Sequence, residues 1–290
     1  MNRNFDPEKI KALAIDLDGT TLLPNGILGD KTKDCLKKLI SRGMRIIIST
    51  GRPAESSEKY RSAIGAEGPM VFYNGAEVSD VPSGKILHTN YINMDVVDFG
   101  AETARKMGIH YQVYLPAGIS PDTGKAVPTQ INAALLIDKF GEEALMYKSH
   151  TGITPVVKDL KKIAALPVNG AIKGMFIADP SLHDEVRRRM NERFGNSINI
   201  MRSFPTFLEV INAGVSKGEG LRIVMEHLGL KPEEVIAFGD EENDVPMFTV
   251  AGYACVPANA RDKIREAADF VYGPNTEEGL AEYLDKIFKI

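Results

Sequence analysis

Residues 13–20 read Leu-Ala-Ile-Asp-Leu-Asp-Gly-Thr, and this stretch decides the fold expected for the chain. The continuous apolar run from Ala12 to Ile15 predicts a strand buried on both faces of a parallel sheet. Asp16 and Asp18 follow at its carboxyl end, and Gly19 supplies a turn. Because side chains alternate along an extended chain, Asp16 and Asp18 can reach one small volume. Two like charges held that close need a cation or a proton between them.

The composition indicates an ordinary globular protein. The chain has 290 residues, of which 43% are hydrophobic and 26% charged, enough for a sizeable core. Its net charge of −4 argues against a general nucleic-acid binder. No apolar run approaches the roughly 20 residues that span a bilayer, and the polar segment 1–9 lacks a signal-peptide apolar region. Cys35 and Cys255 lack metal-ligand spacing and favour reduced thiols. We therefore expect a cytoplasmic protein without nucleic-acid or membrane partners, either monomer or dimer.

Strand and helix patterns alternate through the first part of the chain. A helix is expected over 30–43, and a β-branched strand follows over 44–48. A second helix opens at Pro53 and closes near Gly65, and a third apolar strand covers 69–73. Strands separated by helices imply βαβ units and a parallel sheet.

The pattern changes between residues 85 and 203, where strands and helices mix without polar loop motifs. This segment predicts a separate α+β domain. The first pattern resumes near Leu208 and includes a fourth buried strand over 235–238. We therefore predict an α/β domain formed by residues 1–84 and 204–290, interrupted by a smaller α+β domain of residues 85–203.

Polar side chains gather at the predicted strand ends and helix starts. Ligands of open parallel sheets bind outside the carboxyl ends of the strands. Carboxylates with little histidine or thiol select a hard cation such as Mg²⁺. A lysine, a hydroxyl and a glycine loop before a helix suit a phosphate. Together they predict phosphoryl transfer. The residues concerned are Asp16, Asp18, Thr50, Gly51, Lys217, Asp240, Asn243 and Asp244.

The chemistry suggests a role for each catalytic residue, as a hypothesis. Asp16 attacks phosphorus and forms an aspartyl-phosphate. Asp18 protonates the leaving alkoxide and then deprotonates the hydrolytic water. Lys217 and Mg²⁺ offset the negative charge. The metal set is Asp16, the Asp18 backbone carbonyl, Asp240, and Asp244 as either a ligand or an anchor behind the ligands. The phosphate set is Thr50, Gly51, Lys217 and Asn243, with Asn74 as either a substrate contact or an ordinary turn residue.

Four segments resemble, in order, the four motifs of the haloacid-dehalogenase-like phosphatases. The insertion before the lysine, together with Asn74-Gly75-Ala76, is similar to the Cof-type branch. The resemblance implies a Rossmann-like core, an α+β cap over the active site, Mg²⁺ dependence and hydrolysis of small phosphate esters, sugar phosphates above all. Thr21 departs from the leucine that many members carry there. The segments are Asp16-Leu17-Asp18-Gly19-Thr20, Ser49-Thr50-Gly51-Arg52, Ser216-Lys217-Gly218 and Gly239-Asp240-Glu241-Glu242-Asn243-Asp244.

Two other functions stay open. A phosphotransferase of mutase type would share every core residue named above, and a non-catalytic phospho-ligand sensor could use the same fold. The Asp16 and Asp18 pair disfavours the sensor, because a pure binder has no use for a nucleophile beside an acid. We therefore predict an Mg²⁺-dependent phosphoric monoester hydrolase acting on a small phosphorylated metabolite. Nothing in residues 85–203 identifies that metabolite, and Arg52 is open between a substrate contact and a structural ion pair.

Overall fold

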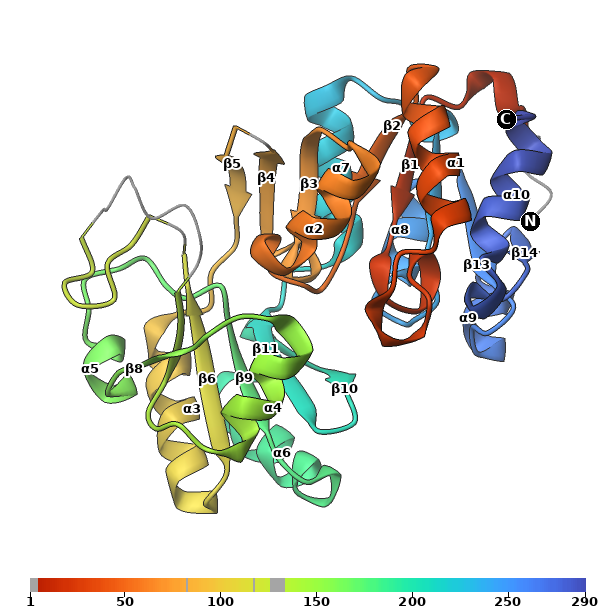
Figure 1. The fold of residues 1–290 in the computed structure, drawn as a ribbon. Helices are drawn as coiled ribbons and strands as arrows, with labels where there is room; N and C mark the ends of the chain where they lie inside the picture. Colours follow the sequence, from red (N-terminus) through yellow and green to blue (C-terminus); the bar gives the residue numbers. More distant parts are fainter. Residues whose placement is uncertain (1–4, 82, 117, 126–133) are drawn as a thin grey trace. The chain divides into compact units, whose positions relative to one another are not determined.

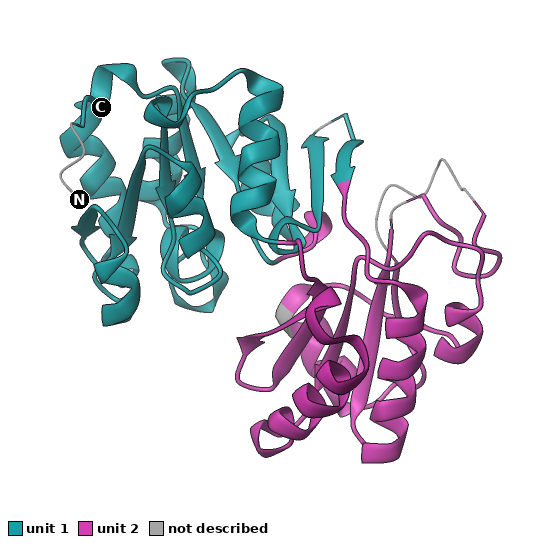
Figure 2. Cartoon of the chain, turned by 180° about the vertical axis from the view of Figure 1, so that it is seen from behind, with its two compact units in different colours: residues 1–51, 57–88, 216–290 teal, residues 52–56, 89–215 magenta. Residues whose placement is uncertain are grey.

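The computed structural model describes residues 5–81, 83–116, 118–125 and 134–290. The chain forms two compact units, coloured separately in Figure 2, each described here by itself. No helix in these described ranges is both long and apolar enough to cross a bilayer. The core unit comprises residues 1–51, 57–88 and 216–290, and the inserted unit comprises residues 52–56 and 89–215.

A five-stranded parallel sheet organises the core unit, in the order β14-β13-β12-β1-β2. The central strand β1 is fully buried, as its apolar run predicts. Its last residue, Ile15, pairs with Phe238 on one side and with Ile48 on the other. Three strand ends therefore meet at one edge of the sheet. The strands are β1 (Ala12–Ile15), β2 (Arg45–Ile48), β12 (Val235–Phe238), β13 (Tyr253–Pro257) and β14 (Phe270–Tyr272).

Helices cover both faces of this sheet, which gives the predicted α/β architecture (Figure 1). Apolar residues of α7, α8 and α9 share one buried cluster with Ala12 and Ala14 of β1. On the opposite face α1 packs against α10. The helices of this unit are α1 (Asp30–Ser41), α7 (Lys217–Leu228), α8 (Val245–Val250), α9 (Asp262–Glu266) and α10 (Gly279–Phe288), together with most of α2 (Ala54–Ile64).

A small three-stranded sheet of β3 (Gly68–Phe72), β4 (Glu77–Val81) and β5 (Lys85–Thr89) completes the core unit. We expected the third apolar strand to join the parallel sheet. It makes one parallel bridge, between Ser49 and Val71, but β3 pairs along its length with β4 in an antiparallel hairpin. The hairpin forms because the chain reverses within the short turn of residues 73–75 and leaves no room for a crossover helix.

The inserted unit contains a six-stranded sheet in the order β10-β11-β9-β6-β7-β8, antiparallel except where β7 meets β8. Apolar residues of one sheet face pack with α3, α5 and α6. β11 pairs with β9 and β10, and this unit continues to Val215. Its elements are α3 (Met94–Met107), β6 (His110–Leu115), β7 (Ala134–Ile137), α4 (Glu142–Thr151), β8 (Val156–Val157), α5 (Leu160–Ala164), β9 (Lys173–Ile177), α6 (His183–Phe194), β10 (Ile198–Phe204) and β11 (Phe207–Asn212).

Candidate active site

Asp16 is held at the carboxyl edge of the central sheet. Its backbone N–H donates to the Phe238 carbonyl of β12 at 3.0 Å, which extends the parallel ladder by one residue. The chain then turns, and the Leu22 N–H closes a loop on the Leu17 carbonyl at 2.8 Å. Asp16 is only 4% exposed, whereas Asp18 is exposed on the same loop. The two predicted catalytic carboxylates therefore have different environments: Asp16 is buried and Asp18 is exposed to solvent.

Lys217 joins two carboxylates that are far apart in the sequence. The Ser216 hydroxyl caps α7 by accepting the Glu219 N–H at 3.1 Å, which places Lys217 in the first helical turn. Its Nζ donates to Oδ1 of Asp16 and to Oδ1 of Asp244, both at 2.6 Å. Lys217 is 1% exposed and Asp244 is fully buried. The structure thus brings the predicted nucleophile and the predicted lysine into direct contact.

Burial and charge pull the pKa values of this group in opposite directions. Burial raises the pKa of Asp16 well above its usual range; Lys217 lowers it, and the neighbouring Asp244 and Asp240 raise it further. Burial lowers the pKa of Lys217, but the two carboxylates outweigh burial and raise it overall. Lys217 is therefore the fixed positive charge of the site.

Asp244 uses both of its oxygens inside the protein. While Oδ1 accepts from Lys217, Oδ2 accepts the backbone N–H groups of Asp240 and Glu241 at 2.9 and 3.0 Å. A Cβ on Gly239 would lie 2.3 Å from the Asp244 Cβ, so the turn needs glycine there. Asp244 therefore shapes the loop that carries Asp240.

Asp240 is held from two sides by the loop that follows Asp16. The Thr20 hydroxyl donates to Asp240 Oδ1 at 2.8 Å. Gly19 has a φ of +78°, and a Cβ there would lie 2.2 Å from Asp240 Oδ2. Burial and the charge of Asp244 raise the pKa of Asp240 to about 7. No role is predicted for Thr20 from the sequence, although its place in the first motif could have indicated one.

The donor chemistry of this edge fits a hard divalent cation. Single oxygens of Asp16, Asp240 and Asp244 lie within 4.8 Å of one another, and carboxylate oxygens are donors that a hard divalent cation prefers. Among the described hydrogen bonds, Asp16 accepts from Lys217 through one side-chain oxygen, and Asp240 accepts from Thr20 through one side-chain oxygen. Their second oxygens are the natural contacts for a cation. The cluster contains three of the four residues that the sequence predicted for Mg²⁺; the fourth, Asp18, was predicted to contribute its backbone carbonyl.

The predicted phosphate-binding residues cluster beside the carboxylates. The Ser49 N–H donates to the Ile15 carbonyl at 2.9 Å, so the loop after β2 starts next to Asp16. The Asn74 N–H donates to the Thr50 carbonyl at 3.0 Å. The Asn243 side-chain amide donates to Asn74 Oδ1 at 2.9 Å. Loops from β2, β3 and β12 thus meet in one place.

Gly51 and Asn74 pack so closely that each limits the other. A Cβ on Gly51 would lie 3.0 Å from Asn74 Oδ1. Asn74 is 1% exposed and has a φ of +59°, between Tyr73 at +51° and Gly75 at +101°. Three consecutive residues with positive φ are unusual, and such strain is typical of functional sites. Asn74 is therefore a turn residue that is also part of the predicted phosphate cluster.

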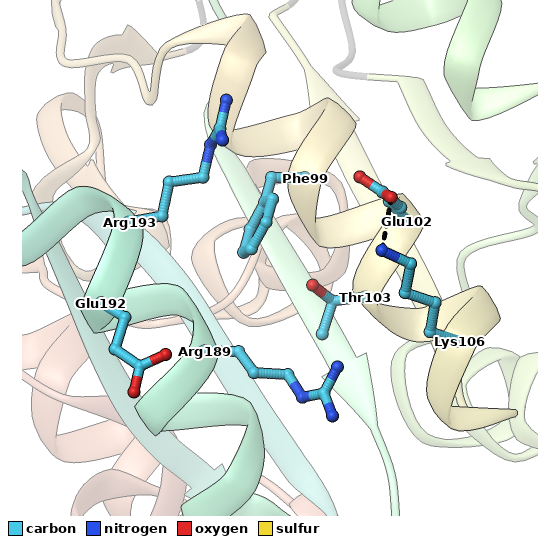
Figure 3. Close-up of a pocket in the computed structure, with 7 residues that line it drawn as sticks. All are labelled: Phe99, Glu102, Thr103, Lys106, Arg189, Glu192 and Arg193. Atoms are coloured by element: carbon cyan, nitrogen blue, oxygen red, sulfur yellow. Dashed lines mark ion pairs between the residues drawn. The ribbon is translucent and has the colours of Figure 1, made fainter.

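A separate surface hollow of about 370 Å³ lies on the inserted unit, between α3 and α6 (Figure 3). Two of its charged residues pair on their own helices, Lys106 with Glu102 at 2.6 Å and Arg189 with Glu185 at 2.6 Å, while Arg193 lies over the ring of Phe99 at 5.0 Å. None of the predicted site residues lines it. The hollow is a charged helix surface, whereas the predicted site residues lie in the core unit. The lining residues are Phe99, Glu102, Thr103, Lys106, Arg189, Glu192 and Arg193.

Fold and site together define an α/β enzyme built to handle phosphate at the carboxyl edge of a parallel sheet. The family model of the haloacid dehalogenase-like hydrolases matches residues 13–284. The chain therefore belongs to this family, in agreement with the resemblance of its four motifs.

Relatives of known sequence and structure agree with this assignment. A protein named putative phosphatase from Haemophilus influenzae is 31% identical over 285 residues, 94% of this chain and 95% of that protein. The HMP-PP phosphatase of an Enterobacter species is 28% identical over 254 residues, 87% of this chain and 85% of that protein. A solved structure from Thermotoga maritima, 28% identical, has a TM-score of 0.80 and covers 96% of this chain and 97% of that one. The protein is thus an enzyme of the phosphoric monoester hydrolase class.

Proposed function

We propose that the protein hydrolyses small phosphate monoesters, sugar phosphates or similar metabolites, through an aspartyl-phosphate on Asp16 and with Mg²⁺ bound. The observation that carries the proposal is the contact of Lys217 with Asp16 and Asp244 at 2.6 Å, buried beside Asp240. A nucleophilic carboxylate must be ionised, and Lys217 opposes the effect of burial on the pKa of Asp16. A sensor would have no need of this arrangement.

In the first step, an Asp16 oxygen attacks phosphorus while the bond from phosphorus to the ester oxygen breaks. Asp18, exposed two residues along the loop, gives its proton to the leaving alkoxide. In the second step, water attacks the aspartyl-phosphate and Asp18 takes up the water proton. Inorganic phosphate leaves and the Asp16 carboxylate is regenerated, so the two steps balance.

The remaining residues hold the reacting groups in place. Lys217, Thr50, the Gly51 backbone and Asn243 hold the phosphoryl oxygens, with Asn74 supporting Asn243. Asp16, the Asp18 carbonyl and Asp240 would hold Mg²⁺, with Asp244 as a ligand or an anchor, and the bound cation would offset the negative charge of the phosphoryl group. The contacts of both Asp244 oxygens favour the anchor role.

Substrate class and location are part of the same proposal. Small phosphorylated metabolites are favoured by the Cof-type motifs and by relatives named phosphatases. A cytoplasmic location is favoured by the two cysteines, Cys35 and Cys255, which are buried free thiols.

The test is phosphate release from p-nitrophenyl phosphate and from a panel of phosphorylated metabolites, with Mg²⁺ present and kcat/KM compared. We expect Asp16→Asn to lower activity by about 10³-fold or more, because it removes the nucleophile. The control is Asp34→Asn, an exposed carboxylate on α1, which should keep parent activity. Unchanged phosphate release in Asp16→Asn would refute the mechanism. Isomer formation without phosphate release would favour the mutase.

A further inference from the structure

Two asparagines from the C-terminal segment hold the outer side of the loop of residues 17–22. The Asn259 side chain donates from Nδ2 to the Gly19 carbonyl at 3.0 Å. The Asn275 side chain donates from Nδ2 to the Leu22 carbonyl at 2.9 Å. The two asparagines are linked, since the Asn275 backbone N–H donates to Asn259 Oδ1 at 2.9 Å. Neither belongs to the motifs that identified the site.

The inner side of the same loop presses on Asp240. Thr20 is 1% exposed and donates its hydroxyl to Asp240 Oδ1 at 2.8 Å. The Gly19 backbone packs directly against Oδ2, where any Cβ would lie at 2.2 Å. The residue whose carbonyl Asn259 holds is therefore the residue that limits the position of the Asp240 carboxylate.

We propose that Asn259 and Asn275 are positioning residues, which fix the loop of residues 17–22 and thereby, through Gly19 and Thr20, hold Asp240 to bind a divalent cation. The inference rests on the proposed function only for the identity of the cation. Loop and carboxylate need such support because the negative charges of Asp16, Asp240 and Asp244 repel one another at this edge. Hydrogen bonds from neutral amides resist that repulsion without adding charge.

Groups that orient metal ligands typically change metal affinity by about 10–100-fold when they are removed. The Thr20 contact is buried, so we expect Thr20→Val to raise the half-saturating Mg²⁺ concentration by about 10-fold or more. Asn259 is exposed and its hydrogen bond competes with water, so Asn259→Ala and Asn275→Ala should each raise this concentration by about 3- to 10-fold, less than a buried contact would. Thr20→Ser keeps the hydroxyl and should retain parent affinity.

The experiment titrates the full chain with MgCl₂ and follows two readouts, the Mg²⁺-dependent rise in Tm and the Mg²⁺ dependence of phosphate release. The Tm readout needs no turnover, so it separates cation binding from catalysis. Asn191→Ala, an exposed asparagine on α6 of the inserted unit, is the matched control and should titrate like the parent. Saturating Mg²⁺ should restore most of kcat in the asparagine variants.

The positioning role predicts a shifted Mg²⁺ titration in both asparagine variants and in Thr20→Val, with recovery in Thr20→Ser. A lower Tm without Mg²⁺, combined with an unchanged half-saturating concentration, would overturn the inference, because that is the signature of a merely structural contact. A parent protein that shows no Mg²⁺-dependent Tm shift would overturn it as well. If the shifts appear while no phosphate is released from any ester, the proposed function fails and the inference stands.

Discussion

Replacing Lys217 by Met tests the charge balance on which the site depends. The substitution keeps an unbranched side chain but removes an ammonium that contacts Asp16 and Asp244 at 2.6 Å, in a place where Lys217 is 1% exposed. Removing one partner of a buried ion pair costs about 3–5 kcal/mol, because the remaining charge is left without compensation. At about 2–4 °C per kcal/mol for a chain of this size, the Tm should fall by about 6–20 °C.

The loss in Lys217→Met should depend on Mg²⁺ and on pH. Without the lysine, the two carboxylates are neutralised by protons or by a cation, so the Mg²⁺-dependent rise in Tm should exceed that of the parent. For the same reason the variant should lose stability more steeply as the pH rises from 5 to 8. Phosphate release should fall by about 10²- to 10³-fold, the effect of removing one charge-stabilising donor.

The matched control is Lys173→Met in the inserted unit, where Lys173 is equally buried and lies 3.1 Å from Glu209. This variant should also lose stability, but it should keep the parent response to Mg²⁺. Thermal unfolding with and without MgCl₂ measures both effects. The reasoning is refuted if Lys217→Met unfolds within about 2 °C of the parent, or if its Mg²⁺ response equals that of Lys173→Met, since about 3 kcal/mol would then be missing.

Three further predictions concern single contacts. Burial raises the pKa of Asp240 to about 7, so its contribution to the stability of the Mg²⁺-free protein is complete below about pH 4 and is lost as the pH rises through 7. Mg²⁺ competes with that proton, and the Mg²⁺-dependent rise in Tm should therefore be larger at pH 8 than at pH 5; equal rises would contradict the assignment. Gly19→Ala should weaken Mg²⁺ binding by about 10-fold or more, because its Cβ would displace the Asp240 carboxylate. Calorimetric titration measures this affinity, and an affinity equal to that of the parent would contradict the prediction. Adding Glu209→Leu to Lys173→Met should recover most of the stability lost in the single variant, because it removes the carboxylate left buried without its lysine. Denaturant unfolding measures this recovery, and a double variant no more stable than Lys173→Met would contradict it.

The parallel sheet could be predicted from the sequence because its strands are buried on both faces. Strands β1 and β12 are four-residue apolar runs with every residue buried, and runs of this length beside polar loops are typical of strands in a parallel sheet. The site residues followed from the same signal, since each lies at a strand end or a helix start. Lys217 could be predicted only from the neighbouring motifs, because a lysine in the first turn of a helix is usually exposed to solvent, whereas here it is 1% exposed.

The hairpin after β3 could not be predicted from the alternation of strands and helices. That rule expects each strand to lead to a helix, but the Tyr73-Asn74-Gly75 turn reverses the chain at once. Within residues 116–167, β8 and α5 could not be predicted either, because they have only two and five residues and are too short to show a period. Part of that segment, residues 126–133, lies outside the described ranges.

The role of Asp244 shows a different limit of sequence reasoning. Motif spacing placed it near the cation but left open whether it was a ligand or an anchor. The proposed anchor role depends on where its two oxygens point, which is toward Lys217 and two backbone N–H groups. The contact of Asn259 is harder still to predict, because its partner is a backbone carbonyl 240 residues away, and every residue type has such a carbonyl.

The charges of the site link three properties: its affinity for a divalent cation, the pH dependence of that affinity, and the stability of the protein. Three carboxylates, Asp16, Asp240 and Asp244, face one ammonium, Lys217, so the ionised group carries two uncompensated negative charges. A divalent cation removes both, and two protons do so at lower pH. Without either, the repulsion acts on the Asp240 loop, which is the part that Thr20 and Asn259 hold. The neutral hydrogen bonds around the loop are therefore needed most when the cation is absent, because they keep the carboxylates close enough to bind it.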